Sequence, residues 1–141
     1  GKAAGATALI GGNSLRGDLF DRGCYYAPTV FTDVAPDSVL AQQEIFGPVV
    51  ALMPFDTEEE AIHLANGTPY GLSGSLWTRD IARALRVSRK MECGVVSINT
   101  SSSVHLEMPF GGFKQSGFGR ELGPAALEHY SEWKSIFIAE D

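Results

Sequence analysis

Short apolar runs alternate with segments of helical periodicity along most of this chain, and that alternation limits the folds it can adopt. The run PVVALMPF (48–55) is almost continuously apolar, which is typical of a strand buried on both faces. Further runs of strand length are 6–12, 29–34, 71–78 and 94–99. The pattern therefore predicts an α/β fold with a mostly parallel sheet flanked by helices.

The helical segments carry recognisable ends. Thr57 with Glu60 three residues later forms a capping box, and Asn66-Gly67 is a stop signal. Asp37 and Ser38 can cap a shorter helix upstream. These signals place helices between the predicted strands, as a parallel sheet requires.

Two further segments complete the predicted fold. In the helix expected over 79–92, one face is predicted to be apolar, and the tail 131–139 alternates as a strand exposed on one side does. With no repeat or linker in the sequence, we expect a single domain over 1–141, whose terminal strand joins another subunit's sheet. The residues on the apolar helix face are Ile81, Ala84, Leu85, Ser88 and Met91.

Net charge, the length of apolar runs and the cysteine positions argue against several classes of protein. The net charge of −6 argues against general nucleic-acid binding, which needs clustered Lys and Arg. No apolar run approaches the roughly 18–20 residues of a membrane-spanning helix. Cys24 and Cys93 lie far apart, so we expect reduced thiols and a cytoplasmic location. Because the sequence starts at Gly1 without methionine, we also expect it to be a piece of something longer.

Local patterns alone identify no catalytic or metal site. The glycine-rich run 109–121 lacks the Lys and Ser/Thr of a phosphate loop, so it is interpreted as a tightly packed loop with several positive φ angles. Neither cysteine has the context of a nucleophile. The histidines lack metal-ligand spacing, and His105 is the one placed nearest a ligand. Glu44 is left open between a surface charge and a ligand group.

Several motifs together carry a resemblance. QQEIFGPVV, PYGLSGSLWTRD, GVVSIN and PFGGFKQSGFGRE occur in this order, and with them the chain resembles the aldehyde dehydrogenase superfamily from its PTVF strand to its EWKSIFI tail. The resemblance implies that 1–141 is the C-terminal part of the catalytic domain, with 131–139 as the oligomerisation strand of a homo-oligomer.

The resemblance also implies roles for individual residues. Glu44 would hydrogen-bond the nicotinamide ribose hydroxyls of NAD or NADP, and Phe46 would pack beside the nicotinamide. Val104, His105 and Phe110 would line the access tunnel for the aldehyde. The polar loop after Asn99 favours a polar or small aldehyde over a long fatty one.

The catalytic residues of that superfamily lie upstream of the region that this chain resembles. They are a cysteine that forms a thiohemiacetal and then a thioester with the substrate, and a glutamate that activates water. We therefore expect no catalytic residue in this chain and no activity from it alone. The alternative is a non-catalytic assembly module or pseudoenzyme derived from the same fold.

Overall fold

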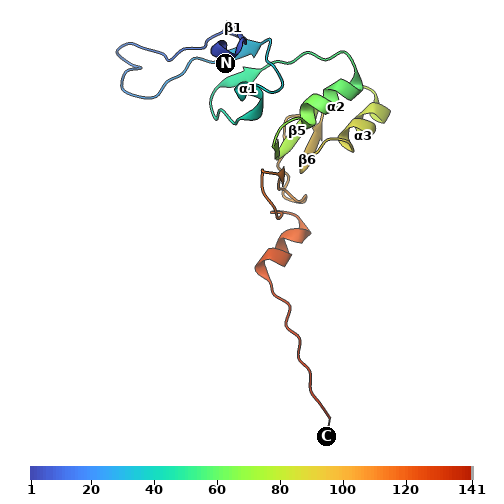
Figure 1. Ribbon diagram of the computed structural model, residues 1–141. Coiled ribbons are helices and arrows are strands. Elements are labelled where there is room, and N and C mark those ends of the chain that lie inside the picture. Colours follow the sequence, from blue (N-terminus) through green and yellow to red (C-terminus); the bar gives the residue numbers. More distant parts are fainter. Residues whose placement is uncertain (141) are drawn as a thin grey trace. The chain divides into compact units, whose positions relative to one another are not determined.

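The computed structural model describes residues 1–140, which form two compact units, Gly1–Thr68 and a second that begins at Pro69. Figure 1 labels the main elements of both. The first unit contains a 3-10 helix η1 (Lys2–Ala4), β1 (Thr7–Ile10), β2 (Thr29–Thr32), α1 (Val39–Gln42), β3 (Val49–Ala51) and α2 (Glu58–Asn66). The second contains β4 (Tyr70–Gly71), β5 (Ser73–Leu76), α3 (Ile81–Ser88), β6 (Val95–Ile98), β7 (Phe113–Lys114) and a 3-10 helix η2 (Pro124–Tyr130).

In the first unit, β2 is the central strand of a three-stranded sheet. It pairs with β1 antiparallel and with β3 parallel. A small core of Ala6, Phe31 and Val34 packs on this sheet. Thr29 is 2% exposed, and its hydroxyl accepts from Gly12 N–H at 2.8 Å while donating to a backbone carbonyl at 2.8 Å. The buried hydroxyl is therefore fully paired.

The second unit has two two-stranded sheets, β5–β6 parallel and β4–β7 antiparallel. The connection between β5 and β6 contains α3, which begins where Asp80 Oδ1 accepts from the N–H groups of Ala82 (2.9 Å) and Arg83 (3.1 Å). An acidic N-cap of this kind satisfies two amide groups that have no partner inside the helix.

The sheets are mixed, which corrects the prediction of a mostly parallel sheet. Both parallel pairs, β2–β3 and β5–β6, have a helix in their connection, because a parallel pair requires a crossover. The link from β1 to β2 has no helix, so those strands pair antiparallel, and β4–β7 joins segments far apart in sequence. The alternation placed a helix in both of these crossovers, but it also placed α2 between strands that do not pair, and it did not predict the antiparallel pairs.

Burial also differs from the predicted pattern. On α3, Ala84 is buried as predicted, and Val87, which was not on the predicted face, is buried as well. Ile81 is 71% and Leu85 47% exposed. The strand in 48–55 is limited to Val49–Ala51 and is half-buried. In each unit, large apolar side chains are thus only partly covered within residues 1–140.

The capping box at the start of α2 is largely as predicted. Thr57 Oγ1 accepts from Glu60 N–H at 3.1 Å. The Glu60 carboxylate accepts from the backbone N–H of Asp56 at 2.8 Å, whereas a capping box would use the N–H of Thr57.

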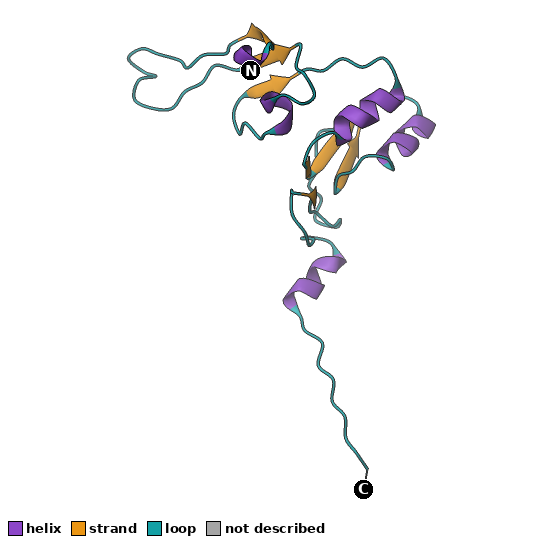
Figure 2. Cartoon of the chain, in the orientation of Figure 1, coloured by secondary structure: helices purple, strands orange, loops and turns teal. Residues whose placement is uncertain are grey.

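No helix within residues 1–140 is long and apolar enough to cross a membrane. Figure 2 draws the segment after η2 as loop, so pairing of 131–139 as a strand stays a prediction.

Candidate functional site

Glu44 and Phe46 lie in one short loop (43–48) between α1 and β3. At its start, the backbone of Gln43 leaves helical geometry with φ −120° and ψ 144°. At its end, Thr29 N–H donates to Pro48 O at 2.8 Å and Val49 N–H donates to Gly47 O at 2.7 Å. The loop is therefore tied to the central strand β2 immediately after Phe46.

The side chains of this loop face solvent. Phe46 is 92% exposed and has φ +52°, a left-handed conformation that costs a bulky residue about 1–2 kcal/mol. Glu44 is exposed as well. Residues held in sparsely populated backbone conformations cluster at active sites and ligand-binding positions. The arrangement presents a carboxylate and a flat aromatic ring two residues apart.

The glycine-rich run 109–121 is packed backbone against backbone. A Cβ on Gly111 would lie 2.5 Å from Gly119 O, and one on Gly112 would lie 2.5 Å from Ser116 Cβ. Gly117 and Gly119 have φ +114° and +83°, which side-chain-bearing residues rarely adopt. The interpretation of this run as a tightly packed loop is confirmed.

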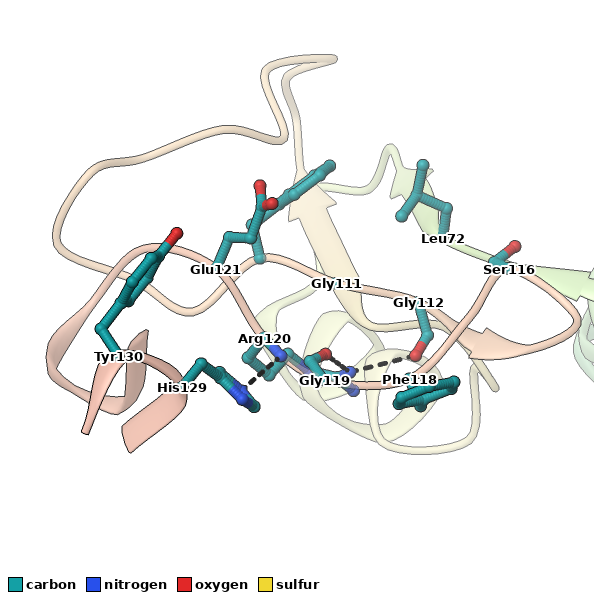
Figure 3. Close-up of a pocket in the computed structure, with 11 residues that line it drawn as sticks. Leu72, Gly111, Gly112, Ser116, Phe118, Gly119, Arg120, Glu121, His129 and Tyr130 are labelled. Carbon is teal, nitrogen blue, oxygen red and sulfur yellow. Dashed lines mark hydrogen bonds between the residues drawn. The ribbon is translucent and has the colours of Figure 1, made fainter. Parts of the chain in front are cut away.

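Arg120 holds the glycine-rich loop together (Figure 3). Its Nη1 donates to Gly112 O at 3.0 Å and to Gly119 O at 2.6 Å, and its backbone N–H donates to His129 Nε2 at 3.2 Å. The guanidinium carbon also lies 5.4 Å from the Phe113 ring centroid, within cation–π range. Neither Arg120 nor His129 was among the site residues predicted from the sequence. A guanidinium placed directly after a run of glycine carbonyls was the available signal for Arg120.

A cavity of ≈ 370 Å³ adjoins this loop, and Phe110 and Phe118 are among the residues lining it. Figure 3 shows Tyr130 and His129 of η2 beside it. The backbone N–H of Phe110 donates to Glu121 O, and the N–H of Glu121 donates to Phe110 O, each at 2.7 Å. Of the predicted substrate residues, Phe110 lines this cavity but Val104 and His105 do not; both are exposed on the loop after β6. The structure therefore does not bring those three together around it.

The two cysteines differ in their surroundings. Cys24 is exposed. Cys93 is half-buried; its thiol donates to Val95 O at 3.3 Å, and desolvation by burial raises its pKa, although the positive charge of Lys114 acts in the opposite direction. A raised pKa leaves less of the nucleophilic thiolate. Among residues 1–140, no three His, Cys, Asp or Glu side chains are grouped so that they could hold a metal ion.

Comparison with known proteins identifies the family of this chain. Residues 1–136 match the aldehyde dehydrogenase family, and the chain belongs to that family. It is 49% identical over 139 residues to a betaine aldehyde dehydrogenase of Agrobacterium fabrum and 50% identical over 138 residues to one of Rhizobium johnstonii.

A similar protein has also been crystallised with NAD⁺. The chain matches a betaine aldehyde dehydrogenase of Staphylococcus aureus in complex with NAD⁺, with a TM-score of 0.87, 45% identity and 92% of this chain covered. The chain spans 26% of the length of that structure. The matches to the Agrobacterium and Rhizobium relatives cover 99% and 98% of this chain, but only 28% of the length of each relative. The match therefore concerns one segment of a much longer protein.

Proposed function

We propose that this chain serves as the C-terminal segment of the catalytic domain of an NAD⁺-dependent aldehyde dehydrogenase, in which Glu44 and Phe46 contact the cofactor. The observation that carries the proposal is the exposed loop 43–48. Its ends are held by backbone hydrogen bonds while the carboxylate and the aromatic ring are left uncovered. The match to a relative in complex with NAD⁺ supports the choice of NAD.

The residues present fit that cofactor. A carboxylate accepts hydrogen bonds from two neighbouring hydroxyls, as a ribose offers, and such charge-assisted bonds are strong. The ring of Phe46, 92% exposed, offers a flat apolar face against which a planar ring can stack. NAD⁺ supplies a hydride acceptor when bound. The part of this chain is to hold and orient it.

The substrate is proposed by similarity. The relatives are named betaine aldehyde dehydrogenases, and a small, charged aldehyde agrees with the polar loop after β6. We assign Val104, His105 and Phe110 to the aldehyde side of the site. A quaternary ammonium group would be attracted to an aromatic face such as that of Phe110.

An assembly role for the tail is the second component of the proposal. Trp133 and Phe137 are 102% and 90% exposed, and a run of exposed large apolar side chains marks an interaction surface. We propose that 131–139 pairs with the sheet of another subunit in a homo-oligomer. The same observation favours the alternative of a non-catalytic assembly module.

The test replaces Glu44 by glutamine in the dehydrogenase that contains this segment. Because Glu44→Gln keeps the shape but removes the charge, we expect about a 10–100-fold loss in kcat/KM for NAD⁺, the equivalent of one charged hydrogen bond. The melting temperature should be unchanged, since Glu44 is exposed. Glu59→Gln, the same change on another exposed carboxylate, should leave both quantities as they were.

Loss of melting temperature with normal turnover per folded molecule would instead make Glu44 structural. The chain by itself should not oxidise aldehydes with NAD⁺. Measurable turnover by the isolated 141-residue chain would contradict the assignment of the nucleophile to a segment outside it.

A further inference from the structure

Gln42, the last residue of α1, makes two hydrogen bonds with one side-chain nitrogen. Its Nε2 donates to Pro36 O at 2.6 Å and to Gly67 O at 2.5 Å. Because both partners are carbonyls, only the amide nitrogen can face them, and the orientation of the side chain is determined. Each of the two amide hydrogens is therefore used by a different acceptor.

The two carbonyls belong to separate parts of the first unit. Pro36 precedes α1, whereas Gly67 is the C-cap of α2, 25 residues beyond Gln42. Between the two helices lies a cavity of ≈ 510 Å³ lined by residues that include Ala41, Leu64 and Gln42 itself. Across this space, the Gln42 amide bridges directly from the end of α1 to the end of α2.

The loop with Glu44 and Phe46 starts at the next residue. Its far end is fixed by the backbone bonds at Pro48 and Val49, and the side chains between are exposed. The near end is fixed by Gln42. We propose that Gln42 is a positioning residue, which sets the location of the Glu44 carboxylate by anchoring the start of its loop to the C-terminus of α2. This rests on the proposed role of Glu44 in cofactor binding.

Because Gln42 donates to two carbonyls, substitutions that remove or restore hydrogen-bond donors at this position test its role. Gln42→Glu has the same shape but places carboxylate oxygens against two carbonyl oxygens, so the bridge must open. Gln42→Lys restores a group with several donors that can reach both acceptors. The neighbouring Gln43 is exposed, and Gln43→Glu makes the same charge change one residue away as a matched control.

Steady-state kinetics of the dehydrogenase that contains this segment tests the proposal. For Gln42→Glu we expect KM for NAD⁺ to rise about tenfold, since a displaced positioning group costs one to two orders of magnitude, while KM for the aldehyde changes less than twofold. Gln43→Glu should remain within about twofold of the parent, and Gln42→Lys should recover most of the loss. Amide hydrogen exchange at 43–47 should accelerate in Gln42→Glu alone.

The outcomes separate this proposal from the one on which it depends. If Glu44→Gln raises KM for NAD⁺ but Gln42→Glu behaves like Gln43→Glu, the positioning role is wrong and the cofactor role stands. If Gln42→Glu lowers the melting temperature and raises both KM values together, or Gln42→Lys gives no recovery, Gln42 is merely structural. If Glu44→Gln has no effect, the cofactor role fails and the positioning role with it.

Discussion

The loop 43–48 and the glycine-rich loop 109–121 are both held by hydrogen bonds to backbone groups, but they differ in what they leave exposed. In the first, backbone hydrogen bonds at Pro48 and Val49 hold the ends while Glu44 and Phe46 remain exposed. In the second, the backbone itself is packed, and Arg120 turns inward to its carbonyls. The contacts thus separate a loop whose side chains are left uncovered, which we propose for cofactor binding, from a loop whose backbone packing leaves no room for side chains.

The sharpest test of this comparison adds one methyl group at Gly94, whose backbone faces the glycine-rich loop, and one at Gly47, inside the loop 43–48. In Gly94→Ala the new Cβ would collide with the carbonyl oxygen of Gly111, and since backbone cannot move aside easily, we expect a loss of at least about 3 kcal/mol in unfolding free energy. In Gly47→Ala the nearest atom is Ile45 Cγ2 at 4.0 Å, and the change should stay within about 0.5 kcal/mol. Thermal or urea unfolding measures both. Equal losses of stability in the two variants would contradict the difference in backbone packing between the two loops.

Removing the arginine should produce the next largest effect. Arg120→Met keeps a long apolar stem but loses both hydrogen bonds to glycine carbonyls and the contact with the Phe113 ring. We expect a loss of about 2 kcal/mol in unfolding stability, and a smaller one for Arg120→Lys, which keeps the charge. A change below about 0.5 kcal/mol in urea unfolding would mean that water replaces the guanidinium at those carbonyls.

Removing the exposed aromatic ring should affect cofactor use but not stability. Because Phe46 is 92% exposed at φ +52°, Phe46→Asn gives up little burial and adopts the left-handed conformation more easily. We expect unfolding stability to be equal or higher by about 0.5 kcal/mol, with a higher KM for NAD⁺. Destabilisation by more than about 1 kcal/mol would show that Phe46 packs on protein.

What the sequence predicted well depended on local chemistry. The cap at Thr57 and Glu60 needs only residues three apart, so α2 has the predicted ends. The glycine-rich loop could be interpreted as tightly packed because glycine permits close backbone approach and positive φ angles at many positions of one run. The cofactor roles of Glu44 and Phe46 came from the resemblance and stay a prediction, since residue patterns alone left Glu44 open between a surface charge and a ligand group.

What the sequence could not predict depended on contacts between distant segments. The antiparallel pairing of β4 with β7 joins residues more than forty positions apart, and the bond of Gln42 to Gly67 spans 25. Helical periodicity predicted that Ile81, Ala84 and Leu85 share the buried face of α3. Ala84 is buried as predicted, but Val87 is buried while Ile81 and Leu85 are exposed. The buried face is set by the neighbouring structure rather than by periodicity alone.

The smallest predicted effect concerns the two thiols, one in each unit. Since burial raises the pKa of Cys93, its thiolate is disfavoured in the folded state, and the associated stability is present at neutral pH and lost as the pH rises through the raised pKa. Disulfide-exchange labelling at about pH 8 should therefore modify the exposed Cys24 first and Cys93 more slowly, with the Cys93 rate rising toward alkaline pH. Lys114→Gln removes the cation that lowers this pKa and should shift the Cys93 rate profile to still higher pH. If Cys93 instead reacted as fast as Cys24 under those conditions, the packing around the glycine-rich loop would be looser than its backbone contacts indicate.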